Sequence, residues 1–181
     1  MQTEPDSDSR IRAALARGDS CALDWIWDAY ASRLLAFAGA LLCSHHDAEE
    51  ILQNVFVKIA QNHAHLAAAR SLKAYLFTMT RNEAYTLARR RGRREIPVDP
   101  DAFGLIPAAP ADPPLPDEAE AAARHLAALP EKQREIIVLK IFEEMTFDEI
   151  SVSLGISLNT AASRYRYGIE KLKRHLNGGT P

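Results

Sequence analysis

The sequence predicts an all-α protein of two helical domains joined by a Pro-rich acidic linker. Apolar residues recur with helical spacing in both halves of the 181-residue chain, and no alternating strand pattern occurs. Seven of the ten prolines fall between Pro97 and Pro116, among acids and alanines, which favours an extended linker. We therefore expect a first domain over 8–94, a linker over 95–118 and a second domain over 119–177.

The distribution of charge follows the same division. The formal net charge of −2 by itself does not indicate a nucleic-acid binder. However, Arg81–Arg94 holds six arginines and one acid, and Leu158–Leu176 holds five basic residues and one acid. Between them, Glu95–Glu120 holds seven acids and no lysine or arginine. Each predicted domain therefore carries its own basic block.

The first domain is predicted to be helical throughout. A helix over 11–17 ends at Gly18, and a proline-free stretch rich in Ala, Leu and aromatics over 22–42 forms the next helix. The stretch 62–70 is less regular, and we expect it to contain a loop. Ser71 is a suitable cap for a further helix, which runs into the arginine block.

Between the long helix and this loop, a capping-box pattern predicts another helix. Asp47 is followed three residues later by Glu50, which is typical of a helix start. Ile51, Val55 and Ile59 then recur every four residues, so they share one face. We expect that face to lie in the core.

The second domain contains the pattern of a helix-turn-helix. Pro130 suits the first position of a helix. Thr146 and Glu149 form a capping box, Gly155 allows a sharp turn, and Ser157 caps the following helix. Such a second helix enters the major groove of DNA in known helix-turn-helix proteins. The side chains expected to reach base edges or phosphates are Asn159, Thr160, Ser163, Arg164, Arg166, Tyr167 and Lys171.

An ordinary helical hairpin with a solvated charged face is the alternative interpretation of this segment. The caps, the glycine turn and the basic second helix occur together, which favours DNA binding.

The arginine block of the first domain is a second candidate for DNA contact. Arg81, Tyr85 and Arg89 share one helix face, and a cationic face with an aromatic side chain suits a DNA backbone with an unstacked base. Positively charged side chains also stabilise a helix C-terminus in proteins that bind no DNA, so the arginine block alone is ambiguous. The candidate contact residues are Arg81, Asn82, Tyr85, Arg89, Arg90 and Arg91.

Other chemistry finds little support in the sequence. Cys21 and Cys43 lie in apolar helical stretches and are expected to be buried free thiols. The histidines at 45–46 and 63–65 lack the Cys or carboxylate partners of a metal site. No phosphate loop, nucleophile elbow or zinc-protease motif occurs, so we expect no metal, no cofactor and no enzymatic activity.

The chain is expected to be cytoplasmic, without membrane contact. Its acidic, polar start does not match a signal peptide, and the longest apolar run, Leu34–Cys43, is too short to span a bilayer.

Taken together, these segments resemble the extracytoplasmic-function group of the sigma-70 family over almost the whole chain. The second conserved region of that group is similar to DAEEILQNVFVKIAQ. Its adjoining promoter-melting and −10-reading helix is similar to SLKAYLFTMTRNEAYTLARRRGRRE. Its fourth region is similar to LPEKQREIIVLKIFEEMTFDEISVSLGISLNTAASRYRYGIEKLK.

The resemblance implies a sigma factor whose partners are core RNA polymerase and promoter DNA, with an anti-sigma factor left open as a further partner. Polymerase docking falls on Glu50, Gln53 and Asn54, although the group usually carries Asp at position 50 and Glu at position 54. The first domain then handles the −10 element and the second the −35 element. Tyr75 and Thr86 stand where the group usually has Trp and Asp.

Two other classes remain open. One is a stand-alone helix-turn-helix regulator, which duplex binding without polymerase would favour. The other is an interaction adaptor whose basic patches are incidental, which failure to bind any DNA would favour.

Overall fold

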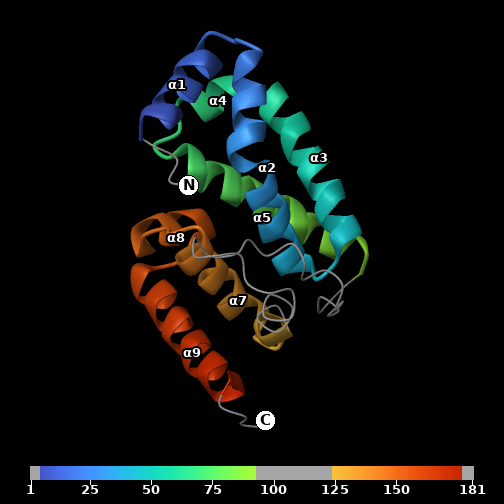
Figure 1. Ribbon diagram of the computed structural model, residues 1–181, viewed down its shortest axis with the longest axis vertical. Coiled ribbons are helices and arrows are strands. Elements are labelled where there is room, and N and C mark those ends of the chain that lie inside the picture. The colour runs from blue at the N-terminus through green and yellow to red at the C-terminus, as the bar shows by residue number, and fades with distance from the viewer. Residues whose placement is uncertain (1–4, 93–123, 177–181) are drawn as a thin grey trace.

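Every secondary-structure element in the described part of the computed structural model is a helix (Figure 1). The structure describes residues 5–92 and 124–176, so the linker predicted over 95–118 lies outside the described residues. The predicted all-α class is confirmed.

The first domain is a bundle in which three long helices surround one core. Its helices α2, α3 and α5 pack against one another, while α1 and α4 lie side by side at one end (Figure 1). The bounds are α1 (Pro5–Ala16), α2 (Cys21–Leu42), α3 (His45–Gln61), α4 (His63–Ala67) and α5 (Leu72–Arg90).

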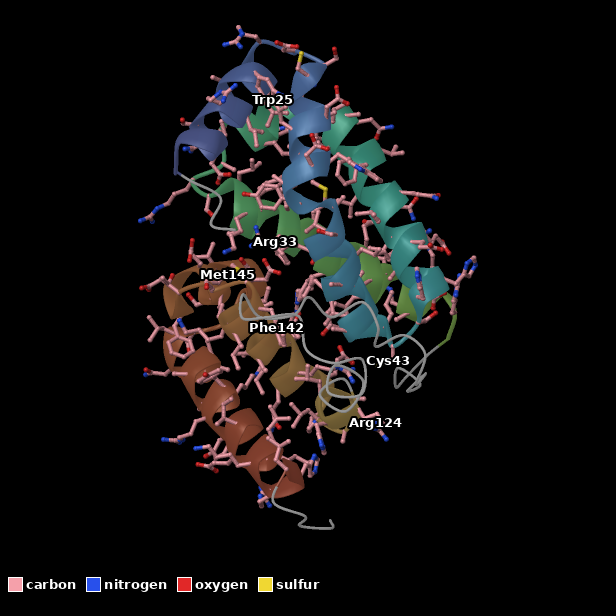
Figure 2. All side chains as sticks on the ribbon, in the orientation of Figure 1. Trp25, Arg33, Cys43, Arg124, Phe142 and Met145 are labelled. Atoms are coloured by element: carbon pink, nitrogen blue, oxygen red, sulfur yellow. The ribbon has the colours of Figure 1, made fainter. Side chains whose placement is uncertain are left out.

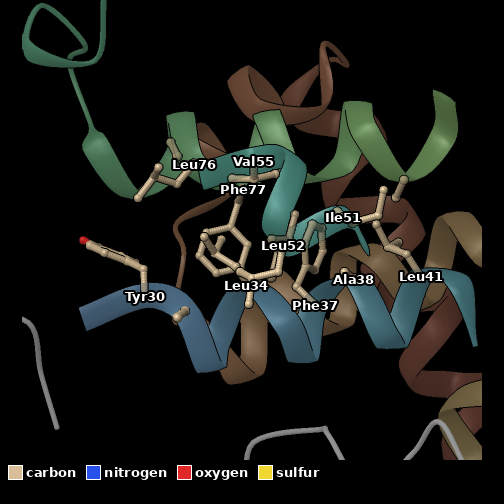
Figure 3. Close-up of a cluster of buried hydrophobic side chains, with 14 of the residues drawn as sticks. Tyr30, Leu34, Phe37, Ala38, Leu41, Ile51, Leu52, Val55, Leu76 and Phe77 are labelled. Carbon is tan, nitrogen blue, oxygen red and sulfur yellow. The ribbon is translucent and has the colours of Figure 1, made fainter. Parts of the chain in front are cut away.

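Apolar side chains from α2, α3 and α5 fill this core (Figure 3). The rings of Phe37 and Phe77 meet edge to face, with centroids 5.1 Å apart. Ile51, Val55 and Ile59 are all buried, as the spacing predicts. Burying each such side chain stabilises the fold by about 1.5–3 kcal/mol.

The start of α3 differs from the prediction. The helix begins at His45, and its cap is Ser44, whose Oγ accepts a hydrogen bond from the backbone N–H of Asp47. Glu50 does not close a capping box on Asp47, since its carboxylate pairs with Arg91. Ser44, three residues before Asp47, supplies the cap, so the helix begins nearer the N-terminus than predicted.

Three further details of the first domain differ from expectation. Helix α1 begins at Pro5, and the stretch 62–70 contains the short helix α4 before the expected loop. Cys43 is a buried free thiol as expected, but Cys21 is exposed at the first turn of α2. Helical position alone did not show that the start of α2 faces solvent.

The second domain consists of helical residues 124–127, α7 (Glu131–Ile137), η2 (Val138–Phe142), α8 (Phe147–Leu154) and α9 (Leu158–Leu176). The π-helical η2 continues α7, and Glu143 caps its end before the turn into α8.

The boundaries of α8 and α9 match the predicted caps, whereas Pro130, predicted as a first helical residue, is the N-cap of α7. Thr146 Oγ1 accepts from the N–H of Glu149, and a Glu149 oxygen accepts from the N–H of Thr146 at 2.8 Å. Gly155 ends α8 with a φ of +63°, a conformation that suits glycine. Ser157 Oγ accepts from Thr160 N–H at 3.1 Å.

The two domains pack against each other in this structure. Helix α8 lies against α5 and α7 lies against α2 (Figure 1). One continuous cluster of buried apolar residues includes members of both domains. The Arg134 guanidinium, itself buried, donates to the Leu41 carbonyl oxygen at the end of α2.

Candidate nucleic-acid interface

The orientation of α9 is fixed by its packing on the first helix of the helix-turn-helix. The rings of Phe147 and Tyr165 meet edge to face with centroids 5.6 Å apart, and Ile150 and Ala161 are fully buried between the helices. Helix α9 also packs on α7, where Gly168 is buried against Ile137, and its remaining face is open to solvent. Its predicted DNA-contacting residues, which are all exposed or half-buried, are Asn159, Thr160, Ser163, Arg164, Arg166, Tyr167 and Lys171.

Several polar groups on α9 already have partners within the helix. Ser163 Oγ donates to the Thr160 carbonyl oxygen at 3.1 Å, and the hydroxyls of Ser157 and Thr160 lie 2.8 Å apart. The Arg166 guanidinium lies 5.2 Å from the ring centroid of Tyr167, a cation–π distance. The hydroxyls would have to rotate to reach a base edge, whereas the exposed Tyr167 is already available.

The predicted contact residues on α5 are divided into two sets by their partners. Arg89 and Arg90 are exposed near the helix end. Arg91 instead bonds to Asp47 and Glu50 of α3, with its Nη2 2.8 Å from the Glu50 carboxylate.

The second set on α5 faces the second domain. Asn82 is exposed, but Arg81 and Tyr85 are half-buried. The Arg81 guanidinium lies 4.7 Å from the Tyr85 ring centroid. Arg81 Nε lies 2.5 Å from a carboxylate oxygen of Glu135 on α7, and this glutamate is buried.

Burial shifts the ionisation of these groups. It raises the pKa of Glu135, an effect that the neighbouring Arg81 opposes. Burial also raises the pKa of the Tyr85 phenol well above its ordinary value, helped by the negative charge of Glu135 and a hydrogen bond to Glu131. The Tyr85 phenol is therefore neutral beside the carboxylates of α7.

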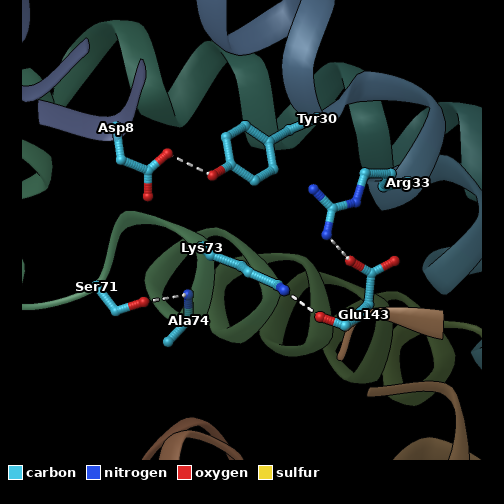
Figure 4. A network of polar contacts seen from close by, with 7 residues as sticks. All are labelled: Asp8, Tyr30, Arg33, Ser71, Lys73, Ala74 and Glu143. Atoms are coloured by element: carbon cyan, nitrogen blue, oxygen red, sulfur yellow. Dashed lines mark hydrogen bonds and ion pairs between the residues drawn. The ribbon is translucent and has the colours of Figure 1, made fainter. Parts of the chain in front are cut away.

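A second buried carboxylate, Glu143, lies where α2 and α5 meet the second domain (Figure 4). Its side chain accepts from Arg33 at 2.5 Å, and its carbonyl oxygen accepts from the Lys73 ammonium. Burial raises the pKa of Glu143 and lowers the pKa of Lys73. Figure 2 shows Arg33 at the boundary with the second domain, next to Met145.

The predicted docking residues lie on the outer face of α3. Gln53 and Asn54 are exposed, and Glu50 is half-buried beside Arg91. Val57, one turn further along, is 55% exposed.

An exposed apolar area adjoins these polar groups. Trp27 of α2 is 51% exposed, and its ring meets that of Phe56 at 4.8 Å. Sequence reasoning missed this area, although Val57 falls outside the i, i+4 series of buried positions and could have indicated it.

The carboxylates that hold the domains together were also missed. Glu131, Glu135 and Glu143 flank the apolar stretch 136–139. Acidic side chains next to a fully buried segment are expected to have charged or hydrogen-bonding partners, and this pattern could have indicated that these carboxylates are paired. The identity of those partners depends on contacts between residues far apart in sequence.

Within residues 5–92 and 124–176, no three His, Cys, Asp or Glu side chains gather in a way that could hold a metal ion. None of the helices in these ranges has the length and apolar character needed to cross a membrane.

Two family models match the chain. The model described as sigma-70 region 2 matches residues 26–94, and the model described as sigma-70, region 4 matches residues 119–172. Among curated relatives, the ECF RNA polymerase sigma factor SigE of Mycolicibacterium smegmatis is 28% identical over 89% of this chain. The chain spans 65% of that relative's length.

Two solved structures share the fold. CnrH, in complex with the cytosolic domain of CnrY, has a TM-score of 0.72 and 22% identity, covering 97% of this chain and all of the other. The sigma factor RpoE of Bartonella quintana, in complex with the anti-sigma factor NepR, has a TM-score of 0.68 and 26% identity. That match covers 83% of this chain and 94% of the other.

Proposed function

Since the chain belongs to the extracytoplasmic-function group of the sigma-70 family, we propose that it binds core RNA polymerase and directs it to promoters with defined −10 and −35 elements. The observation that carries this proposal is the presence of two separate basic helices, α5 and α9, in the order of the two matched regions. A stand-alone regulator would need only the second helix.

In this proposal α9 reads the −35 element in the major groove. Its capped N-terminus and exposed Tyr167 supply groups that can reach base edges, while Arg164 and Lys171 contact phosphates. Helix α5 handles the unstacked −10 strand, with Arg81, Asn82 and Tyr85 at the bases and the arginines 89–91 at the backbone.

Polymerase docking is assigned to the outer face of α3. Gln53 and Asn54 offer hydrogen-bonding groups beside the exposed Val57, with Glu50 at the edge. An apolar centre with a polar surround is the usual composition of a protein interface. This supports docking better than a purely solvated helix face does.

We also propose an anti-sigma factor as a partner. Of the two solved structures above, one is a sigma factor bound to an anti-sigma factor, and the other contains the cytosolic domain of a second protein. Mixing the purified chain with a neighbouring gene product and following loss of transcription would identify such a partner.

The test of the main proposal is run-off transcription with core polymerase from the same host, after co-purification of the two. The double variant Gln53→Ala, Asn54→Ala should bind core roughly tenfold more weakly, since a few central residues carry most of an interface's energy. Gln61→Ala, an exposed change of the same kind on α3, is the matched control. Glu50 is left unchanged because its loss would also remove one of the two carboxylates that pair with Arg91.

Full activity of the folded double variant would place the docking face elsewhere. If the parent gives no promoter-specific transcript but binds duplex DNA alone, the stand-alone regulator is the better assignment.

A further inference from the structure

The second domain brings together two histidines from the two ends of its sequence. His125 lies in the helical residues 124–127, and His175 lies in the last turn of α9. The centroids of their rings are 6.4 Å apart, and the ring planes are inclined by 33°. Both side chains are half-buried, so the fold holds this pair in place more firmly than it would hold two surface groups.

Apolar packing on either side fixes the backbone that carries each histidine. Leu126, next to His125, is buried with Ile137 of α7 in a small apolar cluster. Leu172, one helical turn before His175, packs against the same cluster. Because folding has already brought the two imidazoles together, a ligand that binds both of them meets little further cost in ordering the chain.

One ring nitrogen of the pair indicates what kind of group binds there. His175 Nδ1 is buried and has no hydrogen-bond partner among the described residues. Buried polar atoms in folded proteins nearly always have a partner, and an ion or a water molecule commonly supplies it where the protein does not. An unprotonated imidazole offers one lone pair, which a cation uses and an anion does not.

The separation of the rings suits a transition-metal dication. Imidazole is a common ligand for Zn²⁺, Ni²⁺ and Cu²⁺, whereas Ca²⁺ and Mg²⁺ prefer oxygen ligands. With metal–nitrogen distances of about 2.0–2.1 Å and the size of the rings added, two imidazoles that share one ion have centroids up to about 6.5 Å apart. The pair lies at the open end of this range, so binding an ion would draw the two rings closer.

The surroundings of the pair limit how tightly an ion can bind. Arg124 and Arg174 are neighbours of the two histidines in sequence, and both are exposed, so solvent screens their repulsion of a cation. The C-terminal end of α9 favours positive charge. Since no three ligand side chains gather within residues 5–92 and 124–176, water would complete the coordination, unlike in a closed structural site.

We propose that His125 and His175 form an exchangeable two-ligand site for a transition-metal dication of the zinc type. The expectation of no metal rested on histidines that are close in sequence, whereas the fold brings these two together. An ion bound here links the segment 124–127 to the last turn of α9 and stabilises the folded second domain by mass action. Neither histidine is among the residues assigned to DNA or polymerase, so the site stands apart from the proposed function.

The test titrates Zn²⁺ into the untagged chain, previously freed of metal by a chelator, and follows binding by isothermal titration calorimetry. The test variants are His125→Gln and His175→Gln. The matched control is the double variant His63→Gln, His65→Gln, which removes two exposed imidazoles of the first domain. Circular dichroism without metal checks that every variant is folded.

Each test variant should bind Zn²⁺ at least tenfold more weakly than the parent, because losing even an outer partner of a metal ligand typically costs about 10–100-fold in affinity. The control should bind as the parent does. A second measurement needs no substitution: in the parent, Zn²⁺ should slow amide hydrogen exchange in both 124–127 and 172–176, since the ion binds the folded form of both segments.

Three results would overturn the proposed site. If the parent shows no saturable Zn²⁺ binding, a water molecule is the partner of His175 Nδ1. If only one of the two test variants loses affinity, the ion binds a single imidazole. If the control loses affinity and the test variants do not, the ion binds in the first domain. All three results leave the sigma function untouched.

Discussion

At the scale of single residues, Gly168 determines how closely α9 approaches α7. A Cβ built there would lie 2.7 Å from Ile137 Cδ1 and 3.3 Å from Gln133 Cβ. Alanine favours a helix over glycine by nearly 1 kcal/mol, whereas overpacking a well-filled contact costs about 1–3 kcal/mol. The steric cost should win, because two neighbours must move and one of the close atoms is a Cβ.

We expect Gly168→Ala to lower the free energy of unfolding by about 1 kcal/mol, measured by urea denaturation. Ile137→Val, which removes the closest atom, should cost less in the Gly168→Ala background than in the parent. Additive effects of the two changes would mean that the helices do not meet at this point.

At the scale of elements, α9 should divide into residues that select sequence and residues that only add affinity. Ser163→Ala and Tyr167→Ala should each change the preference between −35 sequences, since base-edge contacts discriminate by about 1–3 kcal/mol. Lys171→Ala should weaken binding to every duplex equally. A uniform loss for all three variants, measured on a panel of duplexes, would make Ser163 and Tyr167 backbone contacts.

The exposed end of α5 should act through phosphates alone. Arg89→Ala with Arg90→Ala should reduce the slope of log affinity against log salt by about one unit per lost contact. Arg10→Ala with Arg17→Ala, two exposed arginines of the same domain outside α5, is the charge-matched control and should leave the slope unchanged. An unchanged slope in the α5 variant would remove these arginines from the interface.

The accuracy of the sequence predictions depended on how local each determinant was. Ser71, Thr146, Gly155 and Ser157 were identified correctly because a cap or turn depends on residues within one helical turn. The start of α3 was misplaced within the same short range, since two residues three apart, Ser44 and Asp47, both suit a cap.

Long-range contacts could not be predicted from spacing. The exposed α9 positions follow from helical periodicity, but the partners of Arg81, Arg91 and Glu143 lie 41 to 110 residues away. Nothing in the sequence near Arg81 indicates that Glu135 lies opposite. For this reason the domains and their basic faces were predictable, whereas the way one domain covers the other was not.

At the scale of the whole molecule, the stability of the fold should depend on pH through Glu135. Because burial raises the pKa of this carboxyl, the folded protein binds a proton there more readily than the unfolded chain does. Its contribution to the free energy of unfolding is therefore complete below the ordinary glutamate pKa and is lost as pH rises through the raised pKa. The charged or titratable groups facing it are Arg81 and Tyr85 on α5, Glu131 on α7 and Arg164 on α9.

Urea denaturation at a series of pH values should show the free energy of unfolding of the parent falling as pH rises through this range. Glu135→Gln, which is neutral at every pH, should reduce that dependence, and the difference between the two curves isolates this one carboxyl. Superimposable curves would assign any pH effect to other groups, such as Glu143.

Arg91 joins the end of α5 to Asp47 and Glu50 at the start of α3, so one guanidinium is shared by the helix proposed for DNA and the helix proposed for polymerase. Such an arrangement constrains how the protein can evolve. Loss of Arg91 would leave the nearly fully buried carboxylate of Asp47 without this counter-charge, and loss of Asp47 would leave Arg91 with Glu50 as its remaining carboxylate partner on α3. Among close relatives we therefore expect positions 47, 50 and 91 to change together, so that a lineage altering its docking helix also inherits an altered end to its strand-binding helix.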